Sequence, residues 1–205
     1  MKNKKKIKYT FIAVLIVLFM ILFVGIKDIY DALSNNTQVK TLMTIEKYGY
    51  TLNENDSPYF KKLFESLKEN LESDDIDEEE YAKVMSQLFV TDFYSLKYAI
   101  SKSDVGGIQF VYSDYQSSFT TKAKDTVYAY VKSNVYGKRK QELPNIKNIE
   151  VTDIKQKEYE GDKISDSKAY YVDLKITYDE DLEYPDEVSL VLVHSKDKLE
   201  IVKMD

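Results

Sequence analysis

The feature that most limits what this chain can fold into is an uncharged stretch close to its start. Residues 9–26 hold no charged side chain and are rich in Ile, Val, Leu and Phe. At about 1.5 Å of rise per residue, a helix over this stretch is about 27 Å long, which is close to the thickness of a bilayer's hydrocarbon core. It also has no polar face to turn toward water. The stretch therefore predicts a transmembrane helix over residues 9–26, with the apolar run Phe11–Ile26 at its heart.

Lysines in front of this stretch set its orientation. The tail 1–8 carries five of them, Lys2, Lys4, Lys5, Lys6 and Lys8. Because cytoplasmic flanks carry an excess of Lys and Arg, we expect a cytoplasmic basic tail and a single-pass cell-membrane protein whose remainder lies outside. A cleaved signal peptide is the alternative. The nearest small residues for its cleavage, Ala32 and Ser34, stand beside charged residues, which favours a retained signal anchor.

The charge of the outer part restricts its partners. The chain carries a formal net charge of −6, and its first 26 residues contribute +5, so the rest carries −11. This balance argues against nucleic-acid binding and against docking of the outer part on anionic lipid. Local basic character remains at Lys138, Arg139 and Lys140, which we interpret as a solvated turn rather than a phosphate site. The chain has no cysteine, which excludes disulfides and thiolate metal sites.

Helical spacing dominates the first half of the outer part. We expect a polar stalk or linker over 27–56 and a folded domain over 57–205. Within the stalk, a helix could continue from the membrane through Val39, Leu42, Met43 and Ile45. Ser57 followed by Pro58 predicts a helix start. Apolar residues at intervals of three and four predict helices over 58–72, 78–100 and 108–132, although Ile108–Tyr112 also fits a short strand.

An acidic run, Glu72–Glu80, lies between the first two predicted helices. It lacks the central glycine of a calcium loop. Asp77 and Glu80 instead fit a capping box, in which each side chain accepts from the other residue's backbone N–H. We therefore expect the acids to begin a helix and no metal to bind.

After Pro144 the apolar period changes from 3.6 to 2. Ile149 and Val151 alternate, Ile154 is offset by a bulge, and Val188–His194 is apolar on both faces and expected to be central. Short connections predict a four-stranded antiparallel meander. The expected fold class is α+β, with about three helices covering the Tyr170, Leu174 and Tyr178 face of the sheet.

This order of elements resembles the nuclear transport factor 2-like, or cystatin-like, cone fold. Among its members it is most similar to the outward-facing domains of membrane-anchored assembly factors in bacterial conjugation and type IV secretion. The resemblance lies in the apolar anchor, the three helices and the strands after Pro144, over about 130 residues. The stretches Val105–Tyr112 and Asn134–Gln141 are also similar to those of uncharacterised clostridial-type membrane proteins. The resemblance to the cone-fold assembly factors implies a cone-like fold and an assembly role. It assigns no residue a function.

Catalytic motifs are lacking. His194 is the only histidine and lies near a strand end, where a packed residue is the simpler interpretation than a base. No nucleophile elbow or glycine-rich phosphate loop is found. Some members of the cone fold use Tyr and Asp in an enclosed pocket. The residues offering that chemistry here are Tyr112, Asp114, Tyr115, Tyr128, Tyr170 and Asp173.

The sequence thus favours a non-enzymatic membrane protein without a cofactor. Its outer domain would contact other envelope proteins or further copies of itself, while the bilayer holds residues 9–26. Tyrosines suited to partner contact are Tyr136, Tyr159, Tyr171 and Tyr184. The alternatives are a tethered ligand-binding or catalytic cone domain, and an inhibitor or immunity-type factor whose acidic surface blocks a basic partner.

Overall fold

The computed structural model describes residues 40–205, which form one compact unit. The predicted basic tail and transmembrane helix lie outside the described residues, as does the first part of the expected stalk. From Lys40 onward, no helix is both long enough and apolar enough to cross a membrane.

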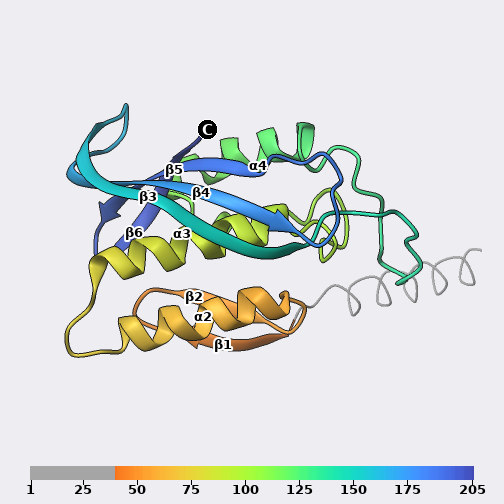
Figure 1. Cartoon of the computed structure of the whole chain (residues 1–205), viewed down its shortest axis with the longest axis horizontal. Helices are drawn as coiled ribbons and strands as arrows, with labels where there is room; N and C mark the ends of the chain where they lie inside the picture. The colour runs from red at the N-terminus through yellow and green to blue at the C-terminus, as the bar shows by residue number, and fades with distance from the viewer. Residues whose placement is uncertain (1–39) are drawn as a thin grey trace, which may run out of the picture. The chain divides into compact units, whose positions relative to one another are not determined.

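A four-stranded antiparallel sheet forms one layer of this unit (Figure 1). Its strands follow one another in space as in sequence: β3 (Ile146–Glu160), β4 (Ser165–Tyr178), β5 (Glu187–Ser195) and β6 (Lys198–Met204). The predicted meander is therefore confirmed, and β5 is an inner strand as expected. The register shifts between Val151 and Asp153, which is the bulge that offsets Ile154.

Three α-helices pack on this sheet: α2 (Pro58–Leu71), α3 (Glu78–Tyr94) and α4 (Gln116–Asp125). The predicted start of α2 is confirmed, since the Phe60 N–H donates to Ser57 Oγ at 3.0 Å. At α3, Asp77 Oδ1 accepts from the Glu80 N–H at 2.9 Å. The Asp77 N–H donates to Asn70 Oδ1 instead of to Glu80, so only half of the expected capping box forms.

Two of the helix predictions were too long. The second helix ends at Tyr94 rather than near residue 100, because the chain beyond it bonds elsewhere: the Lys97 N–H donates to the Pro144 carbonyl at 3.1 Å. The third covers 116–125 rather than 108–132. Before it, the chain forms the short 3-10 turns η1 (Ile108–Phe110) and η2 (Ser113–Tyr115). The Tyr112 N–H donates to the Ile201 carbonyl of β6, a tertiary bond that a continuous helix would break.

The end of the expected stalk is part of the folded unit. β1 (Thr41–Ile45) and β2 (Tyr50–Asn53) form an antiparallel hairpin. Tyr50 is 1% exposed, and its hydroxyl lies 2.6 Å from that of Tyr81 and donates to the Leu199 carbonyl at 3.0 Å. The prediction of a stalk over 27–56 is thus wrong for this part, because only a few apolar residues of the hairpin face the core and their polar neighbours hide the pattern.

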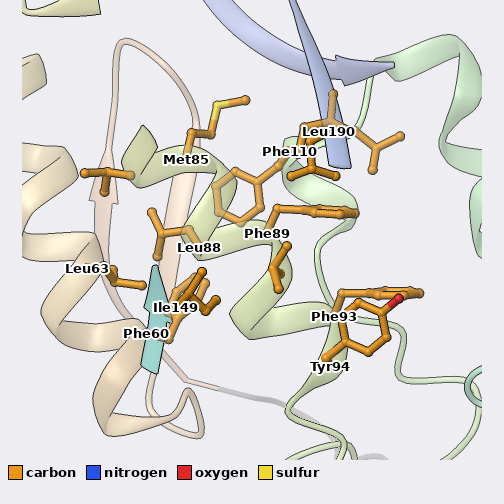
Figure 2. Close-up of a cluster of buried hydrophobic side chains, with 14 of the residues drawn as sticks. Phe60, Leu63, Met85, Leu88, Phe89, Phe93, Tyr94, Phe110, Ile149 and Leu190 are labelled. Atoms are coloured by element: carbon orange, nitrogen blue, oxygen red, sulfur yellow. The ribbon is translucent and has the colours of Figure 1, made fainter. Parts of the chain in front are cut away.

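The core lies between the helices and the sheet, and α3 runs through it (Figure 2). Eleven of the 17 residues of α3 are buried. The Phe89 and Phe93 rings stack with centroids 5.8 Å apart. Phe60 of α2, Phe110 of η1 and Leu190 of β5 belong to the same buried cluster. Burying each such side chain is worth about 1.5–3 kcal/mol, so α3 is the centre of the domain's stability.

Candidate functional site

A groove lies between α4 and the edge strand β6. Its volume is about 420 Å³, and we call it the α4–β6 groove. Apolar side chains make up most of its lining: Phe89, Phe93, Val111, Tyr115, Phe119, Ala123, Val127, Ile201, Val202 and Met204. A groove of this size and polarity can hold several apolar side chains of a partner.

The groove exists because α4 is thinly packed. Ala123 is its only buried residue. Phe119 is half-buried, and its ring centroid lies 5.8 Å from that of Phe89 and 5.2 Å from that of Phe93. These three rings connect the groove directly to the core. An apolar group placed in the groove would therefore rest on a rigid aromatic surface.

β6 supplies the other wall and a free sheet edge. Among residues 40–205, backbone pairing on its outer edge is limited to a parallel bridge between Val111 and Ile201. The Tyr112 N–H donates to the Ile201 carbonyl there at 2.9 Å. Beyond this bridge the strand continues as Val202–Met204 along the groove. A partly paired edge is a surface that an extended segment can join.

Polar residues form the rim of the groove: Ser118, Lys122, Thr126, Lys203 and Asp205. Lys203 Nζ forms an ion pair with the Asp205 carboxylate. That hydrogen bond and charge raise the pKa of Lys203 above its ordinary value, so this lysine stays protonated. An apolar centre with a polar rim is the usual composition of a protein interface.

The predicted pocket residues do not meet in one place. Tyr115 lines the α4–β6 groove, and Tyr112 lies next to it with ring centroids 5.3 Å apart. Asp114 faces outward and pairs with Lys163 at 3.6 Å. Tyr128 is in the core instead, where burial raises its pKa.

Tyr170 and Asp173 lie on opposite faces of β4. The Tyr170 ring is buried on the helix side, 6.0 Å from the His194 ring. Asp173 points to the other face, where it accepts from Ser189 Oγ at 2.6 Å. The space beneath the sheet holds the apolar core of Figure 2, so the six predicted pocket residues define no single ligand site.

The predicted contact tyrosines also differ in exposure. Tyr136 is 75% exposed on the loop before β3. Tyr159 and Tyr171 are half-buried and pack around a small second cluster on the outer face of the sheet. Tyr184 is half-buried and lies against Tyr178, with ring centroids 6.4 Å apart. Only Tyr136 presents most of its ring to a partner.

His194 holds two parts of the domain together. Its Nδ1 lies 2.7 Å from Asp166 Oδ2, which also accepts the His194 backbone N–H at 2.7 Å. Its Nε2 lies 3.8 Å from Glu78 at the start of α3. Burial raises the pKa of Asp166, but bonds from the His194 and Lys168 N–H groups outweigh this and lower it.

A hollow of about 290 Å³ adjoins this histidine, with Tyr48 and Tyr81 in its wall. Burial raises the pKa of Tyr81 to about 12, so its hydroxyl stays protonated near neutral pH. The His194 ring nitrogens lie beside two carboxylates, those of Asp166 and Glu78. The contact between His194 and Asp166 could not be predicted from the sequence, because 28 residues separate the two partners.

Asp92 is the one acid on the packed surface of α3. Its Oδ2 accepts the Gly107 N–H at 2.7 Å. A side chain at Gly106 would lie 2.2 Å from the Asp92 carbonyl oxygen, so the glycine pair allows this close approach. Burial, together with the charges of Asp56 and Asp104, raises the pKa of Asp92 to about 7 despite that hydrogen bond.

Comparisons with protein-family models, with curated proteins and with solved structures found no match. Within residues 40–205, no three His, Asp or Glu side chains gather closely enough to hold a metal ion. The functional argument therefore depends on the groove, the edge strand and the N-terminal sequence.

Proposed function

We propose that the chain is a non-enzymatic, single-pass membrane protein whose outer domain binds other envelope proteins through the α4–β6 groove. The observation that carries this proposal is the groove itself: it is apolar, open, built on core rings and bounded by a partly paired strand edge. The basic tail and uncharged stretch before residue 27 support membrane anchoring with the domain outside.

The groove favours one kind of partner segment. An extended segment with an apolar side chain at every second position would continue along β6 from the Val111–Ile201 bridge and place those side chains over Phe119. Anchoring both proteins in one membrane raises their effective concentration, so weak contacts suffice for assembly. The resemblance to cone-fold assembly factors agrees with this role, and the cone-like fold remains part of the proposal.

Photo-crosslinking in native membranes tests the proposal. A photoreactive amino acid at Val127, in the groove, should capture a consistent partner band. The same group at Glu158, exposed on β3, serves as the control and should not. Recovery of only uncrosslinked monomer from the groove position would overturn the proposal.

A charge placed in the groove should abolish the crosslink. Phe119→Asp puts a carboxylate on the aromatic surface, where an apolar partner cannot compensate it. Thr121→Asp adds the same charge to an exposed site of α4 that does not line the groove, and should leave the crosslink unchanged. Circular dichroism of both variants checks that the domain still folds.

A further inference from the structure

The exposed apolar side chains of the domain gather at one end. Among the described residues, the large apolar side chains that are exposed are Leu42 (49%), Tyr98 (36%), Tyr130 (86%) and Tyr136 (75%). Leu42 lies at the start of β1, Tyr98 follows α3, and the other two belong to the segment between α4 and β3. In Figure 1 the start of β1, the end of α3 and this segment all lie at the right-hand end of the domain.

Hydrogen bonds hold the start of β1 against the end of β2. The Glu54 N–H donates to the Lys40 carbonyl at 2.8 Å, and the Asn53 N–H donates to Asp56. The loop after α3 lies at the same end of the domain in Figure 1.

That loop in turn holds the segment before β3. The Asn134 N–H donates to the Ile100 carbonyl at 2.7 Å. The point at which the described chain begins and the exposed tyrosines therefore share one end of the domain.

The segment 130–141, which we call the basic loop, is rich in positive charge. No acidic residue lies between Asp125 and Glu142. A hollow of about 520 Å³ on its surface is lined by Lys132, Ser133, Tyr136, Lys138, Arg139, Lys140 and Gln141. One end of the domain is therefore basic and rich in tyrosine, although the domain as a whole is negatively charged.

The only arginine of the chain gives the basic loop a fixed shape. Arg139 Nη1 donates to the Ala99 carbonyl at 2.7 Å, and its Nη2 donates to the Lys97 carbonyl at 2.7 Å. Desolvation lowers the pKa of this guanidinium from its ordinary value. The Gln141 side chain also bonds the backbone of Tyr130 and Lys132. Arg139 is thus directed inward, and the lysines and tyrosines are left to face outward.

We propose that this end, the basic loop with Leu42 and Tyr98, lies against the headgroup region of the bilayer that holds the chain. The inference rests on the membrane anchoring in the proposed function. Thirteen residues span at most about 45 Å, so a membrane helix over 9–26 would keep Lys40 within about 45 Å of the membrane surface. Tyrosine is the side chain that suits the boundary between apolar and wet layers, and lysines attract headgroup phosphates.

Neighbouring acids limit how this end can approach the bilayer. Asn145 donates to Asp179 at the start of the acidic loop between β4 and β5, and the charge of Asp179 also acts on Tyr98. Anionic headgroups repel that loop. We therefore expect the domain to touch the membrane with the basic loop foremost, and more strongly where the lipid is anionic.

Lipid-proximity quenching on the full chain tests this orientation. Because the chain has no cysteine, Ser133→Cys in the basic loop and Ser165→Cys near the β3–β4 turn can each carry one fluorophore. The β3–β4 turn lies at the left-hand end in Figure 1, away from the basic loop. The chain is reconstituted in phosphatidylcholine–phosphatidylglycerol vesicles containing a lipid with a quencher on its headgroup. We expect quenching several-fold stronger at residue 133 than at residue 165.

Substitutions then assign the effect to particular side chains. Replacing Lys132, Lys138 and Lys140 by Gln and Tyr136 by Ser should remove most of the quenching at residue 133, while Arg139 is kept to preserve the loop. Equal quenching at the two label positions would overturn the inference, and so would quenching that these substitutions leave unchanged.

Flotation of the same vesicles separates this inference from the anchoring itself. If the chain floats with the vesicles but residue 133 is not preferentially quenched, membrane anchoring stands and the proposed orientation is wrong. If the chain does not float, both are wrong.

Discussion

α3 and α4 contribute to the same core, but in opposite ways. Eleven of the 17 residues of α3 are buried, whereas Ala123 is the only buried residue among the ten of α4. α3 is packed by α2, by η1 and by the sheet, while α4 leaves an apolar groove open beside β6. The comparison indicates that the domain concentrates its stability in one helix and leaves the other helix's surface for binding.

The largest test of this contrast is a pair of matched truncations. Phe89→Ala removes a fully buried ring of α3 and should lower the free energy of unfolding by about 3–5 kcal/mol. Phe119→Ala removes the half-buried ring of α4 and should cost only about 1 kcal/mol, because one side of that ring already faces the groove. Urea unfolding of the detergent-solubilised chain measures both. Equal losses would mean that α4 is as integral to the core as α3.

A second test adds a methyl group where the loop after α3 packs closely against that helix. Gly106→Ala places a methyl group against the Asp92 backbone and should destabilise the domain by about 2–3 kcal/mol. Gly137→Ala is the control: nothing lies within 4 Å of its added methyl, and only its φ of +65° is unfavourable. That variant should lose about 1 kcal/mol. If thermal unfolding shows no difference between the two alanines, the loop is not held against α3 as described.

The smallest expected effect is that of Asp92 ionisation on the stability of the domain. The pKa of Asp92 is raised to about 7 from an ordinary 3.8, so the folded state favours its protonated form. Stability is then highest below about pH 4 and is lost as the pH rises through about 7. The Asp92→Asn variant has no carboxyl group at this position, so it should not lose stability in this way as the pH rises. Between pH 4 and pH 8, the native chain should lose about 1–2 kcal/mol more than the variant, less than the full shift implies because Asp92 is only half-buried.

The control for this pH dependence lies on the same helix. Glu79→Gln changes an exposed carboxylate in the first turn of α3. Its pH profile of unfolding should run parallel to that of the native chain between pH 4 and pH 8. A parallel profile for Asp92→Asn as well would show that the ionisation of Asp92 does not affect folding.

The sequence pattern predicted correctly those parts of the fold that depend on residues close together in the chain. The start of α2 at Ser57–Pro58, the meander after Pro144 and the bulge before Ile154 all follow from adjacent residues. The hairpin β1–β2 was missed because its inward residues are fixed by distant partners, such as Tyr50 by Tyr81. The third helix was predicted too long because Tyr112 bonds to a strand nearly 90 residues later.

The candidate site was less accessible to sequence reasoning. Phe119 and Val127 lie within the helix predicted over 108–132, and the apolar spacing could not show that the helix ends at Asp125 beside a groove. The tyrosines predicted for a pocket were chosen by chemistry alone, and they lie on separate surfaces. Arg139 was interpreted as a solvated charge, but only the fold reveals the carbonyls that it binds.

The succession of the strands has a consequence for how the chain is made. Because synthesis runs from the N-terminus, α2 and α3 emerge before the four-stranded sheet that packs against their apolar sides. β3–β6 span residues 146–204, and each pairs with the strand next to it in sequence. The helices of a nascent chain thus lack this sheet until β3–β6 have also been made. A chain shortened by losing β5 and β6 keeps the residues of α2, α3 and α4 but exposes Phe89 and its neighbours, so we expect such fragments to be substrates for quality-control proteases.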